Sequence, residues 1–187
     1  MNEQQKCAWA LASDLEEEYH DTEWGKPKYD DRMLFEMLIL EGAQAGLSWR
    51  TVLQKRTGYK NAFDNFDVQK VAQYDDAKQA ELLQNPEIIR NKLKIKSAVK
   101  NAQNFIKIQQ EFGSFSDYIW AFVGHKPIIN KWVQTSDVPA STPLSDIISK
   151  DLKKRGFTFI GTTIIYAYMQ SIGMVNDHLV SCPAYHS

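Results

Sequence analysis

The sequence predicts an all-α fold. Apolar residues recur at helical spacing in successive segments separated by short turn signals, and no segment forms a convincing β run. The chain has 187 residues and 43% hydrophobic content, which is enough to bury one full core. No internal repeat or long linker divides it. We therefore expect one domain over residues 1–187, with two helical lobes sharing the core.

Two helices are predicted in the first third of the chain. Acidic residues 30–31 precede an apolar stripe at helical spacing, and acidic side chains are favoured at the positive N-terminal end of a helix. The stripe consists of Met33, Leu34, Met37, Leu38 and Leu40. Gly42 and Gly46 then loosen or end this helix. The second helix begins at Ser48 and has Gly58 where a C-cap is expected.

The middle of the chain predicts shorter helices. Residues 67–74 and 75–83 each have a helical pattern, and the second is capped by Asp75 or Asp76 and ends before Pro86.

A helix, a tight polar hairpin and a second helix are predicted over residues 86–112. The hairpin falls at residues 91–94, and Gly113 ends the segment. A further helix follows over residues 115–123. Residues 124–143 then form a longer irregular excursion, because three prolines interrupt them.

The last two long helices are predicted over residues 145–155 and 162–173. The longest apolar stretch, residues 157–175, is interrupted by threonine, glycine, glutamine and serine, so it predicts a buried helix and no membrane span. The chain opens on polar residues 1–6 with no signal-peptide pattern, and we therefore expect a cytoplasmic protein.

The cysteines and two of the histidines predict a metal site. Cys7 and His20 lie near the start of the chain, and His178 and Cys182 lie near its end, where their i, i+4 spacing places both on one face of a helix. Four nitrogen and sulfur ligands fill a tetrahedral zinc site and leave no position for water. Such a site stabilises the fold and would join the two ends of the chain.

Other interpretations of these four residues remain open. The cysteines could form a disulfide or be simple buried thiols, and the histidines could be ordinary polar surface. The polar start of the chain indicates a reducing cytosol, which disfavours a disulfide and hence a disulfide-stapled small-ligand protein. A catalytic zinc hydrolase would need an open coordination position.

The net charge and the aromatic content limit the classes of function that fit the chain. The net charge of −1 gives no global attraction to nucleic acid and disfavours a protein that coats DNA without selectivity. Aromatic residues make up 12% of the chain, and Trp9, Trp24 and Trp49 fall close to its start. These tryptophans are candidates for a pocket, although buried tryptophan also serves as core filler.

Residues 40–49 place a carboxylate near an aromatic ring. Glu41 ends an apolar helix and Trp49 begins the next one, across a turn that contains glycine. With Tyr19 and Trp9, which the metal site would hold in place, they would form an aromatic box containing one acid. Aromatic faces and a carboxylate together attract a flat, cationic ring. The alternative is a helix-end carboxylate that faces a backbone amide or solvent.

At these residues the chain closely resembles the DNA-3-methyladenine glycosylase I family, a branch of the helix-hairpin-helix glycosylase superfamily. The similarity spans essentially the whole chain. The matching stretches are Tyr19-His20-Asp21, Glu23-Trp24-Gly25, Leu34-Phe35-Glu36-Met37, Leu40-Glu41-Gly42, Gln44-Ala45-Gly46-Leu47-Ser48-Trp49, Lys153-Lys154-Arg155-Gly156-Phe157, Gly161-Thr162-Thr163, and Asn176-Asp177-His178 with Cys182.

The resemblance implies a monofunctional enzyme that hydrolyses the N-glycosidic bond of 3-methyladenine in alkylated DNA. It implies Glu41 as the carboxylate that binds the extruded base and acts in catalysis, with Tyr19 and Trp49 stacking on the base and Trp9 lining the pocket. Glu16 stands where the family has a second pocket tyrosine. The implied ligands of one structural Zn²⁺ per chain are Cys7, His20, His178 and Cys182.

The resemblance also indicates a DNA-binding hairpin, since backbone amides of a hairpin contact phosphates in this superfamily. The candidates for DNA contact are Asn91, Lys92, Lys94 and Lys96. Leu47 is a candidate wedge for the gap left by the flipped base. The alternative for the hairpin is a solvated basic helix end, and basic residues 150–155 predict a plain solvent face.

The expected partners are double-stranded DNA with alkylated bases and free 3-methyladenine as product. No membrane partner is expected, and the default state is a monomer. One other function fits the same pocket: a non-catalytic module that recognises the lesion in DNA without cleaving a bond.

Overall fold

The computed structural model describes residues 5–186. Residues 1–4 and 187 lie outside the described residues, and with them most of the polar start on which the cytoplasmic location was predicted. The described residues are mostly helical, as the sequence predicted. Among them, no helix combines the length and the apolar character needed to span a bilayer.

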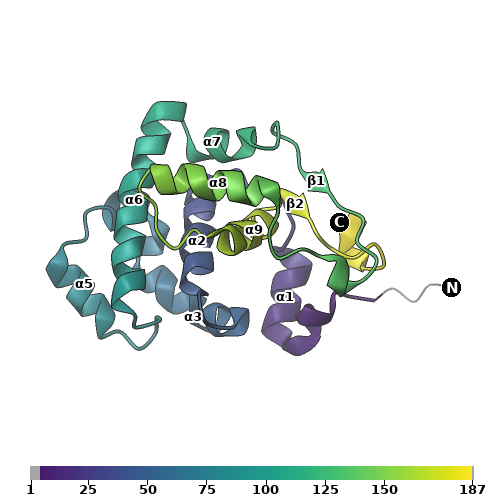
Figure 1. Cartoon of the computed structure of the whole chain (residues 1–187). Coiled ribbons are helices and arrows are strands. Elements are labelled where there is room, and N and C mark those ends of the chain that lie inside the picture. Colours follow the sequence, from purple (N-terminus) through teal and green to yellow (C-terminus); the bar gives the residue numbers. More distant parts are fainter. Residues whose placement is uncertain (1–4, 187) are drawn as a thin grey trace.

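The helices and two very short strands follow one another along the chain with short connections (Figure 1). The elements of the first half are η1 (Ala8–Ala12), α1 (Asp14–Thr22), α2 (Asp31–Ala43), α3 (Trp49–Ala62), η2 (Asp64–Phe66), α4 (Val68–Val71) and α5 (Asp76–Leu83). Those of the second half are α6 (Lys92–Phe112), α7 (Phe115–Ala121), β1 (Ile128–Ile129), η3 (Thr135–Asp137), α8 (Pro143–Lys154), α9 (Thr162–Ser171), β2 (Val175–Asn176) and η4 (Pro183–His186).

Most helices start at a side chain that caps them. Asp30 accepts a hydrogen bond from the amide of Met33, and Ser48 accepts one from the amide of Thr51. Asp75 is the cap of α5, which settles the choice between two adjacent aspartates. Such caps satisfy amides that have no partner within the helix. Helix starts were therefore readable from local sequence.

Helix α2 is the centre of the fold. Residues 34–43 are all buried, and α2 packs against α3, α6, α7 and α9 (Figure 1). Its side chains join one buried apolar cluster that extends from Cys7 to Ala184. Because α2 is enclosed, a polar residue near its C-terminal end lies in the protein interior.

The two ends of the described chain lie side by side (Figure 1). The amide of Gln5 donates to the carbonyl of Ser181 at 3.2 Å. Nearby, β1 and β2 form a two-stranded parallel pair in which Ile128 faces Val175. This small pair was not predicted, because each strand has only two residues. It fixes the excursion after α7 beside the segment that leads to the C-terminus.

Several helix boundaries differ from the prediction: α4 covers only Val68–Val71 of the predicted residues 67–74, and two differences near the hairpin are more informative. Helix α3 does not end at Gly58 but continues to Ala62. The predicted helix at residues 86–90 is a turn, in which Asn85 Oδ1 accepts the amide of Glu87 at 2.9 Å. This side-chain bond competes with helix formation. The first arm of the hairpin is therefore α5, and the second arm is α6.

The turn that contains Glu87 passes close to position 58 of α3, which explains why this position is glycine. A Cβ atom at Gly58 would stand 2.2 Å from the carbonyl oxygen of Glu87. Glycine at this position serves close packing of the hairpin on α3, so the residue marks an approach of two backbones and does not mark a helix end.

We predict that Gly58→Ala destabilises the protein by about 1–3 kcal/mol, the usual penalty for overpacking. In an unobstructed helix the same change would stabilise by up to about 1 kcal/mol. Denaturant unfolding measures the difference. The exposed neighbour Thr57→Ala is the matched control, for which a neutral or slightly stabilising effect is expected. A stabilised Gly58→Ala variant would contradict the close approach.

Candidate functional site

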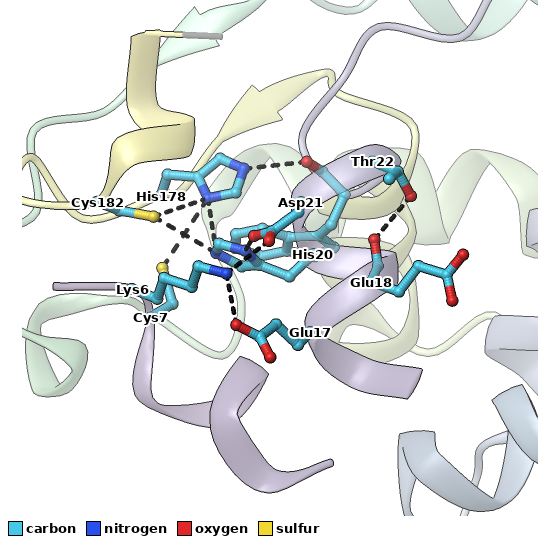
Figure 2. Close-up of polar contacts among 10 residues, drawn as sticks. Lys6, Cys7, Glu17, Glu18, His20, Asp21, Thr22, His178 and Cys182 are labelled. Carbon is cyan, nitrogen blue, oxygen red and sulfur yellow. Dashed lines mark hydrogen bonds and ion pairs between the residues drawn. The ribbon is translucent and has the colours of Figure 1, made fainter. Parts of the chain in front are cut away.

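The structure brings Cys7, His20, His178 and Cys182 together. All four residues are buried, and their ligand atoms lie within 4.8 Å of one another (Figure 2). His178 Nδ1 is 3.1 Å from His20 Nε2 and 3.7 Å from Cys182 Sγ. Burial lowers the pKa of His178 to about 4, so its imidazole is neutral and able to ligate at neutral pH. This group can hold a metal ion.

In both imidazoles, the ring nitrogen that points away from the cluster has a hydrogen-bond partner that orients the ring (Figure 2). His20 Nδ1 lies 2.8 Å from Asp21 Oδ1, and His178 Nε2 lies 3.0 Å from the carbonyl oxygen of Trp24. Lys6 in turn donates to Asp21 Oδ2 at 2.6 Å. Such partners fix the ring orientation and tautomer of a metal-binding histidine. In each ring they leave the nitrogen that points into the cluster free for a metal.

The segment that carries His178 and Cys182 is not a helix, contrary to the prediction. Residues 177–182 form a loop and a turn after β2. The side chains still converge because the loop folds back on α1 and the turn that follows it, where Gly25 allows the approach. A Cβ atom at Gly25, whose φ is +75°, would stand 3.0 Å from His178 Nε2.

A pocket of about 290 Å³ opens beside this cluster. Its lining comes from both ends of the chain, the end of α2, the start of α3, and α9. The lining residues are Cys7, Trp9, Glu16, Tyr19, Trp24, Glu41, Gln44, Trp49, Thr135, Val138, Ala167, Gln170, Asp177 and Leu179. Glu41, Tyr19, Trp49 and Trp9, which the sequence analysis selected for a base pocket, therefore line one cavity.

The aromatic walls of the pocket touch one another. The ring centroids of Tyr19 and Trp49 are 5.4 Å apart, and those of Trp9 and Trp24 are 5.1 Å apart. Trp24 also packs edge-on against His178, with centroids 4.7 Å apart. The wall of the pocket and the metal-ligand cluster are thus parts of one packed unit.

Glu41 is one of three buried acids that line this pocket, together with Glu16 and Asp177. It lies near the C-terminal end of α2 and is only 5% exposed. Burial raises the pKa of its carboxyl to about 8, and a hydrogen bond with Ser171 partly opposes this rise. A carboxyl in such surroundings changes its charge readily when a cation arrives, because the ligand replaces the missing solvation.

Two further polar atoms of the pocket have no hydrogen-bond partner among the described residues. They are the hydroxyl of Tyr19 and the indole nitrogen of Trp49, and both atoms are buried. Unpaired buried donors are rare in folded proteins and cost stability. Both belong to side chains that wall the cavity, and neither atom is itself exposed to it.

Glu16 gives the pocket a polar wall. It is 8% exposed, and its carboxylate accepts from Ser13 Oγ at 2.8 Å and from Arg50 Nε at 3.1 Å. Arg50 is the second residue of α3, directly after Trp49. The ion pair thus connects α1 to the start of the helix that carries Trp49.

The candidate DNA-binding residues lie around the α5–α6 hairpin. Asn91, Lys92 and Lys96 are exposed, and Asn91 caps α6 by accepting the amide of Lys94 at 3.0 Å. The ammonium of Lys94 instead points inward and donates to the carbonyls at the end of α2. Leu47 lies in the turn between α2 and α3 and is 41% exposed.

Several lining residues were not selected from the sequence. Gln44 lies inside the stretch that carries Glu41 and Trp49, so its neighbours could have indicated it. Gln170, on α9, is one of the few polar residues of a largely apolar helix. Thr135 and Val138 come from the irregular excursion, where no sequence pattern indicates a pocket wall.

Comparisons with known proteins agree with this geometry. Residues 9–186 match the family model for methyladenine glycosylase. The DNA-3-methyladenine glycosylase of Haemophilus influenzae is 47% identical over 178 residues, covering 95% of this chain and 96% of its own. The DNA-3-methyladenine glycosylase 1 of Escherichia coli is 46% identical over 181 residues, covering 97% of each chain.

A solved structure gives the same result. The 3-methyladenine DNA glycosylase I of Staphylococcus aureus, solved to show the structural basis of 3-methyladenine recognition, superposes with a TM-score of 0.94 at 36% identity. The match covers 98% of this chain and 97% of that one. Sequence and fold thus match over nearly the full length of the chain, which belongs to the methyladenine glycosylase family.

Proposed function

We propose that this protein is a monofunctional DNA glycosylase that excises 3-methyladenine from alkylated double-stranded DNA and leaves an abasic site. The observation that carries the proposal is the buried carboxyl of Glu41 in a pocket walled by aromatic rings. Family membership supports it, since the relatives above carry the name of this activity.

The chemistry of the lesion explains why such a pocket suffices. Methylation at N3 gives the base a delocalised positive charge while it remains attached to the sugar. In hydrolysis the C1′–N bond breaks, the base leaves with the bonding electrons and becomes neutral, and water adds its hydroxyl to C1′ and releases a proton. A cationic leaving group needs little help from a general acid. Recognition of the cation can therefore supply much of the selectivity.

We assign that recognition to Glu41. An ionised carboxylate in a water-poor pocket attracts a cation far more strongly than it would in bulk water. Aromatic faces add about 2 kcal/mol or more when the cation is desolvated. The rings of Tyr19 and Trp49, which contact each other in the wall of the pocket, would stack on the flat base. Trp9 completes the wall.

To reach the pocket, the base must leave the duplex, which costs a few kcal/mol of unstacking and unpairing. We propose that the α5–α6 hairpin works as the helix-hairpin-helix element and holds the opened DNA. Its exposed residues Asn91, Lys92 and Lys96 would contact phosphates. Leu47 projects from the turn beside Glu41 and would fill the gap in the base stack.

We propose a structural Zn²⁺ ion as the occupant of the Cys7, His20, His178 and Cys182 cluster. Zinc–nitrogen and zinc–sulfur bonds in a tetrahedron place ligand atoms about 3.3–3.8 Å apart. Four of the six separations between the ligand atoms run from 3.1 Å to 3.9 Å, and all six are within 4.8 Å. Two sulfur and two nitrogen donors are also the set that zinc prefers in closed sites.

The remaining expectations follow from this arrangement. The single buried cluster from Cys7 to Ala184 supports one glycosylase domain, within which we propose two helical lobes. We propose that it acts as a monomer, with free 3-methyladenine as product. The two cysteines are unpaired thiols, which suits metal binding in a reducing cytoplasm.

The function is tested by incubating the protein with DNA that carries radiolabelled methyl groups and separating the released bases. Free 3-methyladenine should appear, and 7-methylguanine should stay in the DNA. Glu41→Gln should weaken binding of free 3-methyladenine at least 10-fold in calorimetry, because a charge-assisted contact is worth about 1.5–3 kcal/mol. No release from a folded wild-type sample would reject the enzyme and favour a lesion-binding module.

The buried carboxyl also predicts how stability depends on pH. The pKa of Glu41 rises from its ordinary value near 4.5 to about 8 in the folded state. Between these values the unfolded chain loses the proton and the folded chain keeps it, so the free energy of unfolding falls as pH rises. Glu41→Gln removes this effect. The melting temperature of Glu41→Gln minus that of wild type should rise from pH 4.5 to pH 8 and stay constant above pH 8.

Glu18→Gln, which replaces one exposed carboxyl of α1 by an amide, is the matched control for the substitution itself. An equal pH dependence for Glu41→Gln and wild type would contradict the neutral, buried carboxyl.

Metal removal separates a structural site from a catalytic one. Elemental analysis should find one zinc per chain, and chelation should lower the free energy of unfolding by several kcal/mol, with recovery on adding Zn²⁺. Cys182→Ser should lower zinc content in the same way. If chelation abolished base release and left the melting temperature unchanged, the site would be catalytic and the structural assignment would fail.

A further inference from the structure

Lys94 is oriented differently from its basic neighbours. Its ammonium donates to the carbonyl of Ala43 at 2.9 Å and to the carbonyl of Ala45 at 2.6 Å. Lys92 and Lys96, two residues before and after it on α6, are exposed, whereas Lys94 is partly buried. The ammonium therefore bonds to the protein and faces away from the surface of the hairpin.

The position of the two carbonyls explains the attraction. They belong to the C-terminal end of α2 and the turn after it, where carbonyls lack helical partners and the helix dipole is negative. Hydrogen bonds from a charged donor are about twice as strong as neutral ones. Burial lowers the pKa of Lys94, which is consistent with an ammonium withdrawn from solvent.

These carbonyls lie within the segment that builds the pocket. Glu41 lies two residues before Ala43, and Leu47 lies two residues after Ala45. The turn has few internal bonds, among them the amide of Leu47 donating to the carbonyl of Gln44 at 2.7 Å. Lys94 adds two bonds from outside and restrains the turn from the side of the hairpin.

The backbone of Lys94 is fixed at the same time. Its amide donates to the side chain of Asn91, the cap of α6, and the next residue, Ile95, is 3% exposed in the core. The first turn of α6 therefore has two anchors. The Asn91 cap holds it to the hairpin, and the Lys94 side chain holds it to the turn that follows α2.

We propose that Lys94 is a positioning residue that sets the distance and orientation between the DNA-holding hairpin and the base pocket. The inference rests on the proposed glycosylase function, because it assumes that phosphates contact the hairpin while the flipped base occupies the pocket. Lys94 binds neither phosphate nor base. It keeps Glu41 and Leu47 in register with DNA held at Asn91, Lys92 and Lys96.

Lys94→Met tests this role, since methionine keeps an unbranched side chain and removes the charge and the donors. Amides of residues 44–49 should exchange with deuterium faster than in wild type. The single-turnover rate of base release at saturating DNA should fall by about 10-fold to 100-fold, the range for a misplaced site. The affinity for undamaged duplex, and its slope against salt concentration, should not change.

Lys92→Met is the matched control on the same helix. It should leave the exchange of residues 44–49 as in wild type and make the salt slope shallower by about 0.9, the value for one lost phosphate contact. If Lys94→Met gave that slope change with unaltered exchange, Lys94 would be a phosphate contact and the proposal would be overturned.

Two other results are also decisive. A lower melting temperature with an unchanged rate at saturating DNA would show that Lys94 merely supports the fold, which overturns the positioning role. If wild-type protein released no base, the proposed glycosylase would fail, while the exchange of residues 44–49 in Lys94→Met would still decide whether Lys94 restrains the turn.

Discussion

The convergence of four buried ligand side chains from the two ends of the chain is the constraint on which the site depends. Cys7 and His20 meet His178 and Cys182 within 4.8 Å, although the two pairs are separated by most of the sequence. Their packing fixes α1 against the C-terminal loop. Tyr19 precedes a ligand directly, and Trp24 packs against His178. One wall of the pocket is thus built from residues whose positions the cluster determines.

The opposite wall comes from the core helix α2. A helix enclosed on all sides can deliver a carboxyl to the interior, and Glu41 is delivered there at the expense of stability, since burial favours its neutral form. A pocket that disfavours an isolated negative charge binds a positively charged ligand more favourably, because the ligand stabilises the carboxylate. The feature that strains the empty protein would therefore be the one that selects the cationic base in the proposed function, as expected where stability and function compete.

Much of this could be predicted from sequence, for identifiable physical reasons. Caps such as Asp30, Ser48 and Asp75 act on amides a few residues away, so local sequence carries their signal. Resemblance to a family supplied the pocket residues, and the structure places them around one cavity. What failed depended on distant contacts. Local sequence predicted a helix end at Gly58. Glycine is needed there because the backbone of Glu87, in another segment, passes close to it.

Lys94 and the C-terminal ligands show the same limit. In a run of basic residues, every lysine side chain is expected to face solvent or a phosphate. Only the fold reveals that the partners of Lys94 lie about fifty positions earlier in the chain. His178 and Cys182 have the spacing of a helix face, yet they converge from a loop, because the fold of the loop on α1 brings them together. Side-chain spacing predicted that these residues cluster, but with the wrong local structure.

A crystal structure of the protein with free 3-methyladenine tests the central claim most directly. We expect the base to stack on the rings of Tyr19 and Trp49, with the carboxylate of Glu41 in hydrogen-bonding distance of its edge and the Cys7, His20, His178 and Cys182 cluster unchanged beside it. A base that binds elsewhere at saturating concentration, or that enters the pocket without contacting Glu41, would contradict recognition by this carboxylate.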